Sequence, residues 1–112
     1  MKLYNWNKVE GITIQSLQEN KLTEILVAEK RVGLLKRNDK VYAFSATCPH
    51  AGANLCDGWL DPLGRIVCPD HQYHYDPANG RNTSGEGYKL FTYPVEIKGD
   101  DIFVGILAGS NS

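Results

Sequence analysis

The pattern of apolar and polar residues along the chain predicts short β-strands rather than long helices. Residues 12–15 alternate isoleucine with a polar residue, and residues 102–106 carry Ile, Val and Ile at every second position. Two further apolar runs, 23–30 and 31–37, are rich in Ile, Val and Leu and are split at residues 29–31. A period of two is typical of strands, because successive side chains of a strand point to opposite faces. The chain is therefore predicted to be all-β.

Turn residues separate these strands at short intervals. The segment RNDK, at 37–40, predicts a hairpin turn into the strand VYAFSA, and KGDD, at 98–101, predicts a turn between FTYPVEI and the last strand. Pro94 has no backbone N–H to give to a neighbouring strand, so FTYPVEI is expected at a sheet edge or with a bulge at the proline. Short strands at this spacing fit a small β-sandwich or barrel.

Length and composition limit the classes of protein to which the chain can belong. Its 112 residues are expected to form a single domain, residues 1–112, and an apolar fraction of 42% with a charged fraction of 22% is ordinary for a globular protein. The net charge of −1 makes nucleic acid and acidic membrane surfaces unexpected partners. No apolar run is long enough to cross a bilayer, and the first residues lack the apolar core of a signal peptide, so a cytoplasmic location is expected.

The middle of the chain departs from the strand pattern and concentrates the residues that bind metals. All three cysteines and all three histidines fall between residues 48 and 77. Stretches dense in Gly, Pro, Asn and Asp surround them and predict two loops, at about 46–60 and 66–80, with GRIV at 64–67 as the strand between them. Loops of this length are usually functional, so two loops that project from the sheets are expected to form the site.

Cysteine and histidine occur together near the start of both loops. The pattern is C-x-H at Cys48 and His50, then seventeen residues, then C-x-x-H at Cys68 and His71. In the cytoplasm cysteines are more often thiols or metal ligands than disulfides, and thiolate with imidazole is a ligand set for zinc, copper or iron. A zinc-stabilised interaction domain stays open as one interpretation, although zinc sites more often use C-x2–4-C and H-x3–5-H pairs.

Both half-motifs and their spacing resemble the cluster-binding motif of the Rieske [2Fe–2S] family. The resemblance extends to KVYAFSATCPHAG at the first loop and to YPVEIKGDDIFVGI near the end of the chain, as in soluble Rieske ferredoxins. It implies a small Rieske-like β-sandwich or barrel with a two-loop cluster-binding subdomain, and one [2Fe–2S] cluster per chain. It further implies that Cys48 and Cys68 hold one iron and that His50 and His71 hold the other.

The resemblance also bears on the surroundings of the cluster and on its reduction potential. It implies that the Tyr75 hydroxyl lies near a cysteine sulfur, and that Tyr73 and Leu55 are further neighbours of the cluster. High-potential respiratory Rieske proteins carry an additional cysteine in each loop, and the matching positions here are Ala53 and Asp70, so their disulfide cannot form. Tyr73 stands where those proteins place a serine. A low to intermediate potential is therefore expected, as in ferredoxins that serve oxygenases.

The other notable residues of the loops are expected to have structural roles. Cys56 is expected to be a small, buried or half-buried side chain rather than a ligand, and His74 a loop residue with a local hydrogen bond. Leu55 and Trp59 are expected to pack the first loop onto the sheets. Four glycines are expected in turns or in the third loop that covers the cluster in this family: Gly52 and Gly58 in turns, Gly85 and Gly87 in that loop.

The resemblance assigns an electron-transfer function to the chain. A single [2Fe–2S] centre transfers one electron, and the chain has no G-x-G-x-x-G fingerprint of a dinucleotide site. The expected protein is an electron carrier, not an enzyme: a soluble, monomeric ferredoxin that takes electrons from a flavin reductase and delivers them to a terminal oxygenase. Docking is expected around His50 and His71, through a small and transient interface. The alternative is the small subunit of an NADH-dependent assimilatory nitrite reductase, bound to the large subunit of that enzyme.

Overall fold

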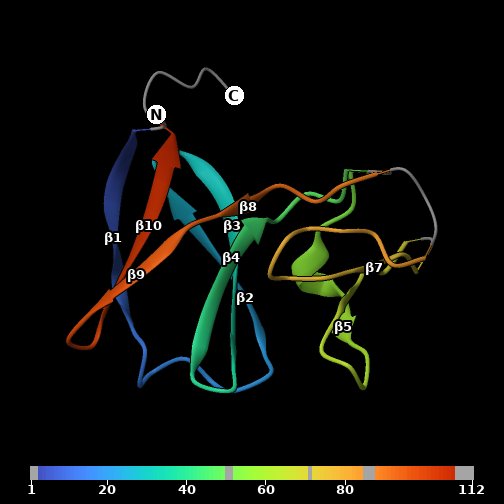
Figure 1. Cartoon of the computed structure of the whole chain (residues 1–112), viewed down its shortest axis with the longest axis horizontal. Coiled ribbons are helices and arrows are strands. Elements are labelled where there is room, and N and C mark those ends of the chain that lie inside the picture. The colour runs from blue at the N-terminus through green and yellow to red at the C-terminus, as the bar shows by residue number, and fades with distance from the viewer. Residues whose placement is uncertain (1–2, 50–51, 71, 85–87, 108–112) are drawn as a thin grey trace.

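The computed structural model describes residues 3–49, 52–70, 72–84 and 88–107. Short antiparallel strands make up nearly all of its regular structure, which confirms the all-β prediction (Figure 1). In chain order the elements are β1 (Tyr4–Thr13), β2 (Leu22–Val27), β3 (Lys30–Arg37), β4 (Lys40–Ser45), the 3-10 helix η1 (Leu55–Asp57), β5 (Trp59–Leu60), β6 (Ile66–Val67), β7 (His74–Tyr75), β8 (Thr92–Tyr93), β9 (Val95–Lys98) and β10 (Asp101–Leu107). Within these described ranges, no helix is long and apolar enough to cross a membrane.

The strands form three sheets. β1, β10 and β9 form the first sheet, β2, β3, β4 and β8 form the second, and β5, β6 and β7 form a third, smaller one. The first two sheets pack together as the base of the molecule, and the third lies beside them with η1 (Figure 1). The structure is a small β-sandwich that carries a subdomain built from the middle of the chain, which is the architecture that the sequence predicts.

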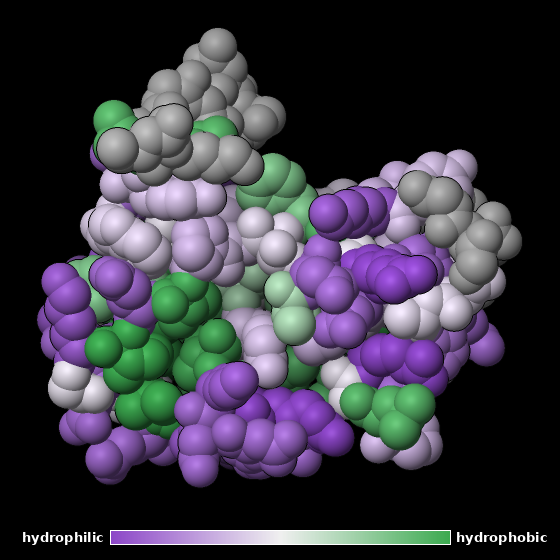
Figure 2. Space-filling view, viewed as in Figure 1, coloured by the Kyte–Doolittle hydropathy of each residue, from purple (hydrophilic) through white to green (hydrophobic). Residues whose placement is uncertain are grey.

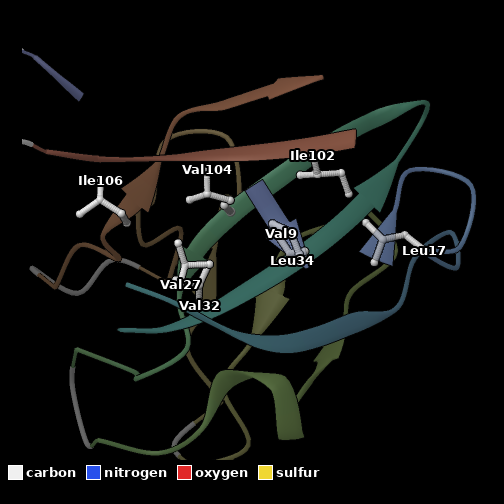
Figure 3. Packing of buried hydrophobic residues seen from close by; sticks show 9 residues of the cluster. Val9, Leu17, Val27, Val32, Leu34, Ile102, Val104 and Ile106 are labelled. Atoms are coloured by element: carbon white, nitrogen blue, oxygen red, sulfur yellow. The ribbon is translucent and has the colours of Figure 1, made fainter. Parts of the chain in front are cut away.

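The core of the base lies between the first two sheets (Figure 3). Val9 of β1, Leu34 of β3 and Val104 of β10 point toward one another there, and the last two are fully buried. β10 supplies Ile102, Val104 and Ile106 at every second position, which confirms the predicted alternation. Each buried aliphatic side chain of this kind stabilises the fold by roughly 1.5–3 kcal/mol relative to an exposed one, so this face holds the base together.

β3 buries both of its faces, which explains why RVGLLKR is a continuous apolar run. Val32 and Leu34 face the core of the base, whereas Leu35 faces a second buried cluster. Strands that are covered on both sides show such runs instead of an alternation. The second cluster contains buried residues from the sheets and from both loops: Leu35, Phe44, Cys48, Leu55, Ile66, Cys68, Tyr75 and Leu90. This second cluster joins the base to the third sheet.

β1 begins earlier than the sequence predicts, and Pro94 separates two edge strands. β1 spans Tyr4–Thr13, so the alternation predicted at 12–15 overlaps only its last two residues, and Ile14 and Gln15 lie in the turn that follows. β8 ends just before Pro94 and β9 begins just after it, and each is an edge strand, of the second and the first sheet respectively. A proline cannot donate to a neighbouring strand, so its position confirms the expectation of a sheet edge.

Two hairpin turns of the second sheet share a backbone shape but differ in their residues. The turn between β3 and β4 consists of Asn38 and Asp39, at φ 53° and 64°, which confirms the turn predicted from RNDK. The turn between β2 and β3 consists of Ala28 and Glu29, at φ 49° and 67°, rather than of residues 29–31 as the sequence indicated. Asparagine tolerates the left-handed region better than alanine does, so the Ala28–Glu29 turn is the more strained of the two.

Candidate metal centre

Backbone hydrogen bonds hold Cys48 at the base of the first loop. The Cys48 N–H donates to the carbonyl oxygen of Ala53 at 2.8 Å, and the Gly52 N–H donates to the carbonyl oxygen of Cys48 at 2.9 Å. Gly52 has a φ of 74°, in the left-handed region that glycine adopts without strain, which confirms its expected role in a turn. The end of the loop is bound to the residue that follows β4, because the Leu55 N–H donates to the carbonyl oxygen of Ala46 at 2.7 Å.

The second loop repeats this arrangement around Cys68. The Cys68 N–H donates to the carbonyl oxygen of Tyr73 at 2.9 Å, and the Gln72 N–H donates to the carbonyl oxygen of Cys68 at 3.1 Å. Gln72 takes the position that Gly52 has in the first loop, and its φ is 59°. The two loops therefore hold their cysteines in the same local geometry, although only the cysteine and the proline after it coincide in sequence.

Cys48 and Cys68 are both buried in the second cluster. Each has an exposed fraction of 1%, and neither forms a disulfide. The hydroxyl oxygen of Tyr75 lies 3.5 Å from the sulfur of Cys48. Burial raises the pKa of the Cys68 thiol to about 11, and the neighbouring Cys48 thiol contributes to the rise. Burial also raises the pKa of the Tyr75 hydroxyl, so this interior does not favour negative charge by itself.

The chemistry of these side chains fits a metal centre. The thiolate is the form of cysteine that binds a metal, and two buried thiolates need positive charge beside them. Iron or zinc supplies that charge, and soft thiolate ligands favour such metals. The expected histidine ligands, His50 and His71, lie outside the described residues, as do Gly85 and Gly87 of the expected third loop. In the part of the chain that the structure describes, no three His, Cys, Asp or Glu side chains gather as a metal site.

The third sheet turns one face toward the two cysteines and the other away from them. Leu60 of β5 pairs with Ile66 of β6, which in turn pairs with Tyr75 of β7, and all three belong to the second cluster or pack against it. Residues paired across antiparallel strands share a face, so these three define the inner face. The outer face carries the next pairs along the strands: Trp59, Val67 and His74. Figure 2 shows a mostly polar surface on the side of the molecule that holds the third sheet, apart from a hydrophobic group at its lower edge.

This alternation of faces overturns one expectation about the first loop. Trp59 does not pack the loop onto the base: it lies on the outer face with an exposed fraction of 47%, because Leu60 takes the inner position. Leu55 is fully buried in the second cluster, as expected. Gly58 ends η1 by donating its N–H to Leu55, and a Cβ at this glycine would collide with the carbonyl oxygen of Val67.

His74 is not a loop residue with a local hydrogen bond, which corrects a second expectation. It begins β7, and its Nδ1 lies 2.7 Å from Oδ2 of Asp61, thirteen residues earlier. Asp61 also accepts from Nε of Arg65 at 2.7 Å and from the N–H groups of Leu63 and Arg65 at 2.9 Å. Burial alone would raise the pKa of Asp61, but the hydrogen bonds from Arg65, His74 and Leu63 outweigh it and hold the pKa well below its usual range.

Tyr73 and Cys56 lie at the edge of the second cluster. Tyr73 packs against its buried residues and stacks on Tyr88, with the ring centroids 6.3 Å apart. Cys56 is half-buried, as expected, and burial, together with the charges of Glu24 and Asp57, raises the pKa of its thiol to about 11. Tyr73 therefore connects the second loop to Tyr88, and Cys56 stays protonated at neutral pH.

Asn54, which was not among the predicted functional residues, connects the first loop to β2. Its Nδ2 donates to Oε1 of Glu24 at 2.7 Å, and its Oδ1 accepts the N–H of Cys56 at 2.9 Å. Arg31 on β3 donates from Nε to Oε2 of the same glutamate at 2.6 Å. An asparagine before a short turn is a recognisable cap, but no sequence signal points to a glutamate thirty residues away.

Comparison with known proteins identifies the family. The family model described as the Rieske [2Fe–2S] domain matches residues 6–94. The ferredoxin component of the alkene monooxygenase system of Xanthobacter autotrophicus is 23% identical over 97 residues, which cover 87% of this chain and 80% of the relative. The solved ferredoxin of carbazole 1,9a-dioxygenase from Nocardioides aromaticivorans IC177 is 29% identical, with a TM-score of 0.80 over 88% of this chain and 96% of its own.

Two further solved structures share the fold. A chain in the complex of reduced oxygenase and oxidised ferredoxin in carbazole 1,9a-dioxygenase is 27% identical, with a TM-score of 0.78 over 89% of this chain and 92% of its own. A protein of Mycobacterium tuberculosis described as an NADH-dependent nitrite reductase small subunit has a TM-score of 0.82 over 95% of this chain and 98% of its own, and its 19% identity shows the fold alone. Because the family model spans most of the sequence, the chain belongs to the Rieske [2Fe–2S] domain family, whose cofactor is a [2Fe–2S] cluster.

Proposed function

We propose that this chain is an electron carrier that binds its cluster between the two loops, with Cys48 and Cys68 at one iron and His50 and His71 at the other. The observation that carries the proposal is the repeated backbone geometry that holds Cys48 and Cys68, both buried and neither in a disulfide, at the base of the two loops. The histidines follow the cysteines by only two and three positions in the sequence, which supports their assignment to the same centre. Two histidines in place of two cysteines raise the potential above that of an all-cysteine cluster.

The residues around the loops supply the surroundings that electron transfer needs. The bound cluster accepts and releases one electron. Leu55 and Ile66 are fully buried in the same cluster as the two cysteines and exclude water from the sulfur atoms. The Tyr75 hydroxyl can donate its hydrogen to Cys48, which stabilises negative charge on that sulfur and favours the reduced state.

We infer that the electron donor is a flavin-containing reductase and that the acceptor is a terminal oxygenase. The relatives support the oxygenase as acceptor, because they include ferredoxins of an alkene monooxygenase system and of carbazole 1,9a-dioxygenase, and a structure of the latter system holds oxygenase and ferredoxin together. The reductase as donor rests on the resemblance to soluble Rieske ferredoxins. Docking is proposed around His50 and His71 of a monomer. A net charge of −1 gives little long-range steering, which suits a small and transient interface.

The experiment that tests the function is an EPR spectrum of the dithionite-reduced protein, purified without air, together with iron, sulfide and zinc analysis. A Rieske-type signal with two irons and two sulfides per chain is expected. A colourless protein that gives no EPR signal and contains one zinc per chain would refute electron transfer and make the chain a zinc-stabilised interaction domain.

A second candidate is the small subunit of a nitrite reductase, a kind of protein that shares this fold at a TM-score of 0.82. The two candidates differ in the permanence of the partner. The test is to purify the tagged protein from its own host by affinity chromatography and to measure the mass of the eluted protein by native mass spectrometry. A ferredoxin elutes alone after a wash at high salt, whereas a subunit remains bound to a large redox chain in fixed stoichiometry.

A further inference from the structure

Asn82 carries a buried hydrogen-bond donor without an acceptor. It is the one buried polar residue in the described part of the chain, with an exposed fraction of 8%. Its Oδ1 accepts the N–H of Ser84 at 2.8 Å, which closes an Asx-turn. Its Nδ2 has no hydrogen-bond partner among the described residues. A buried N–H group without an acceptor destabilises the fold. We therefore expect Nδ2 to find an acceptor that is bound from outside the chain, such as water, an ion or a cofactor.

Asn82 lies on the inner face of the third sheet, opposite Tyr75. The two residues form an antiparallel bridge that is flanked by two backbone hydrogen bonds. These bonds run from the Thr83 N–H to the His74 carbonyl oxygen at 2.8 Å and from the Asp76 N–H to the Arg81 carbonyl oxygen at 2.9 Å. Opposite residues between such bonds form a close pair whose side chains share a face. Tyr75 reaches Cys48 from this face, so Asn82 lies on the side of the cysteines.

The orientation of the Asn82 amide leaves its donor end available. Because Oδ1 accepts from Ser84, the amide group is held in one orientation and Nδ2 is the end without a partner. Apolar side chains form most of the cluster that contains Tyr75 and the cysteines, and the polar side-chain atoms of its fully buried members are the two cysteine sulfurs and the tyrosine hydroxyl. Cysteine thiolates and inorganic sulfide carry negative charge when a cluster is bound, and they accept hydrogen bonds from amides.

We propose that Nδ2 of Asn82 donates a hydrogen bond to a sulfur atom of the bound cluster or of its cysteine ligands, and thereby raises the reduction potential. The inference rests on the proposed function, because it requires the cluster between the two loops. Reduction adds one negative charge to the cluster, so a fixed donor beside sulfur stabilises the reduced state more than the oxidised one. Asn82 is a positioning residue in this account and forms no bond to iron.

Two simpler roles of Asn82 give different expectations. If a buried water accepts from Nδ2, removal of the amide leaves the potential unchanged. If the residue only shapes the turn through Ser84, a replacement that keeps the acceptor also leaves the potential unchanged. Two variants separate these roles. Asn82→Ser keeps an oxygen that can accept from Ser84 and removes the distal donor, whereas Asn82→Leu has a similar size and removes both functions.

The matched control is Asn79→Ala. Asn79 is exposed, lies in the same turn-rich segment after β7, and accepts the Arg81 N–H at 2.8 Å, so it offers a similar local hydrogen bond away from the interior. The midpoint potential of each cluster-loaded protein is measured by EPR-monitored redox titration. We expect Asn82→Ser and Asn82→Leu to shift the potential downward and Asn79→Ala to leave it unchanged, with a Rieske signal in all three.

An unchanged potential in Asn82→Ser would overturn the proposal, and it would do so even if Asn82→Leu takes up no cluster. A second measurement is pulsed EPR of the reduced wild-type protein with 15N in its asparagine side-chain amides. A weak nitrogen coupling that disappears in Asn82→Ser supports the hydrogen bond, and a coupling that is unaffected by this substitution refutes it. A wild-type protein without any Rieske signal would refute the proposed function itself, and this inference with it, so the two failures are distinguishable.

Discussion

The hydroxyl oxygen of Tyr75 lies 3.5 Å from the sulfur of Cys48, although the two residues are 27 positions apart in the sequence. Cys48 belongs to the first loop, and Tyr75 lies on β7, in the part of the second loop that follows Cys68. The contact therefore joins the two loops at the sulfur atom of a proposed iron ligand. It also places a hydroxyl donor where additional negative charge develops when the protein is reduced.

Replacement of Tyr75 by phenylalanine should lower the midpoint potential by about 20–60 mV. The range follows from the usual contribution of one hydrogen bond, about 0.5–1.5 kcal/mol, because a one-electron couple shifts by about 59 mV for each 1.4 kcal/mol. Tyr93→Phe is the matched control, since Tyr93 is half-buried against the core of the base. A cluster-loaded Tyr75→Phe protein with an unchanged potential would show that this hydroxyl does not stabilise the reduced state.

The three histidines of the chain should differ in their effect on the cluster. His50→Ala and His71→Ala are expected to lose the cluster or to change its visible and EPR spectra, because each removes a proposed ligand. His74→Ala is the control, since His74 lies on the outer face of the third sheet and contacts Asp61. We expect His74→Ala to keep the iron content and the spectrum. A normal spectrum in His50→Ala or His71→Ala would contradict the ligand assignment.

Much of the base could be predicted from the sequence because its signals are local. The alternation in β10 reflects one buried face, and the apolar run of β3 reflects burial on both faces. The turn at Asn38 and Asp39 carries the residues that its backbone shape prefers. The C-x-H and C-x-x-H patterns, likewise local, indicated both of the cysteines that the structure buries in one cluster.

The third sheet could not be predicted in the same way, because its strands have two residues each. A period of two cannot be recognised in so short a segment, so the sequence does not reveal whether Trp59 or Leu60 turns inward. Pairing with β6 decides this choice, and β6 is paired in turn with β7. The partners of His74 and Asn82 depend on the same pairing, which brings together segments that are distant in the sequence.

The two matched hairpin turns should respond in opposite directions to exchange of their residues. Ala28→Asn is expected to raise the free energy of unfolding by about 0.5–1 kcal/mol, because asparagine adopts a positive φ at lower cost than alanine. Asn38→Ala should lower it by a similar amount. The measurement is the shift in the urea midpoint of the cluster-loaded protein, followed by circular dichroism. Shifts of the same sign in both variants would contradict the backbone argument.

Cys56 should react slowly with alkylating reagents despite its partial exposure. Burial, followed by the charges of Glu24 and Asp57, raises the pKa of its thiol from 9.0 to about 11. Only the thiolate reacts, so at pH 8 alkylation by iodoacetamide should be about 100-fold slower than that of an unperturbed cysteine. The rate should rise about tenfold per pH unit until the pH approaches the pKa. Intact-mass measurement on the cluster-loaded protein gives the rate, and Cys56→Ser, which should take up no label while the cluster is bound, is the control. Labelling as fast as that of a peptide cysteine would show that the thiol is not held in its neutral form.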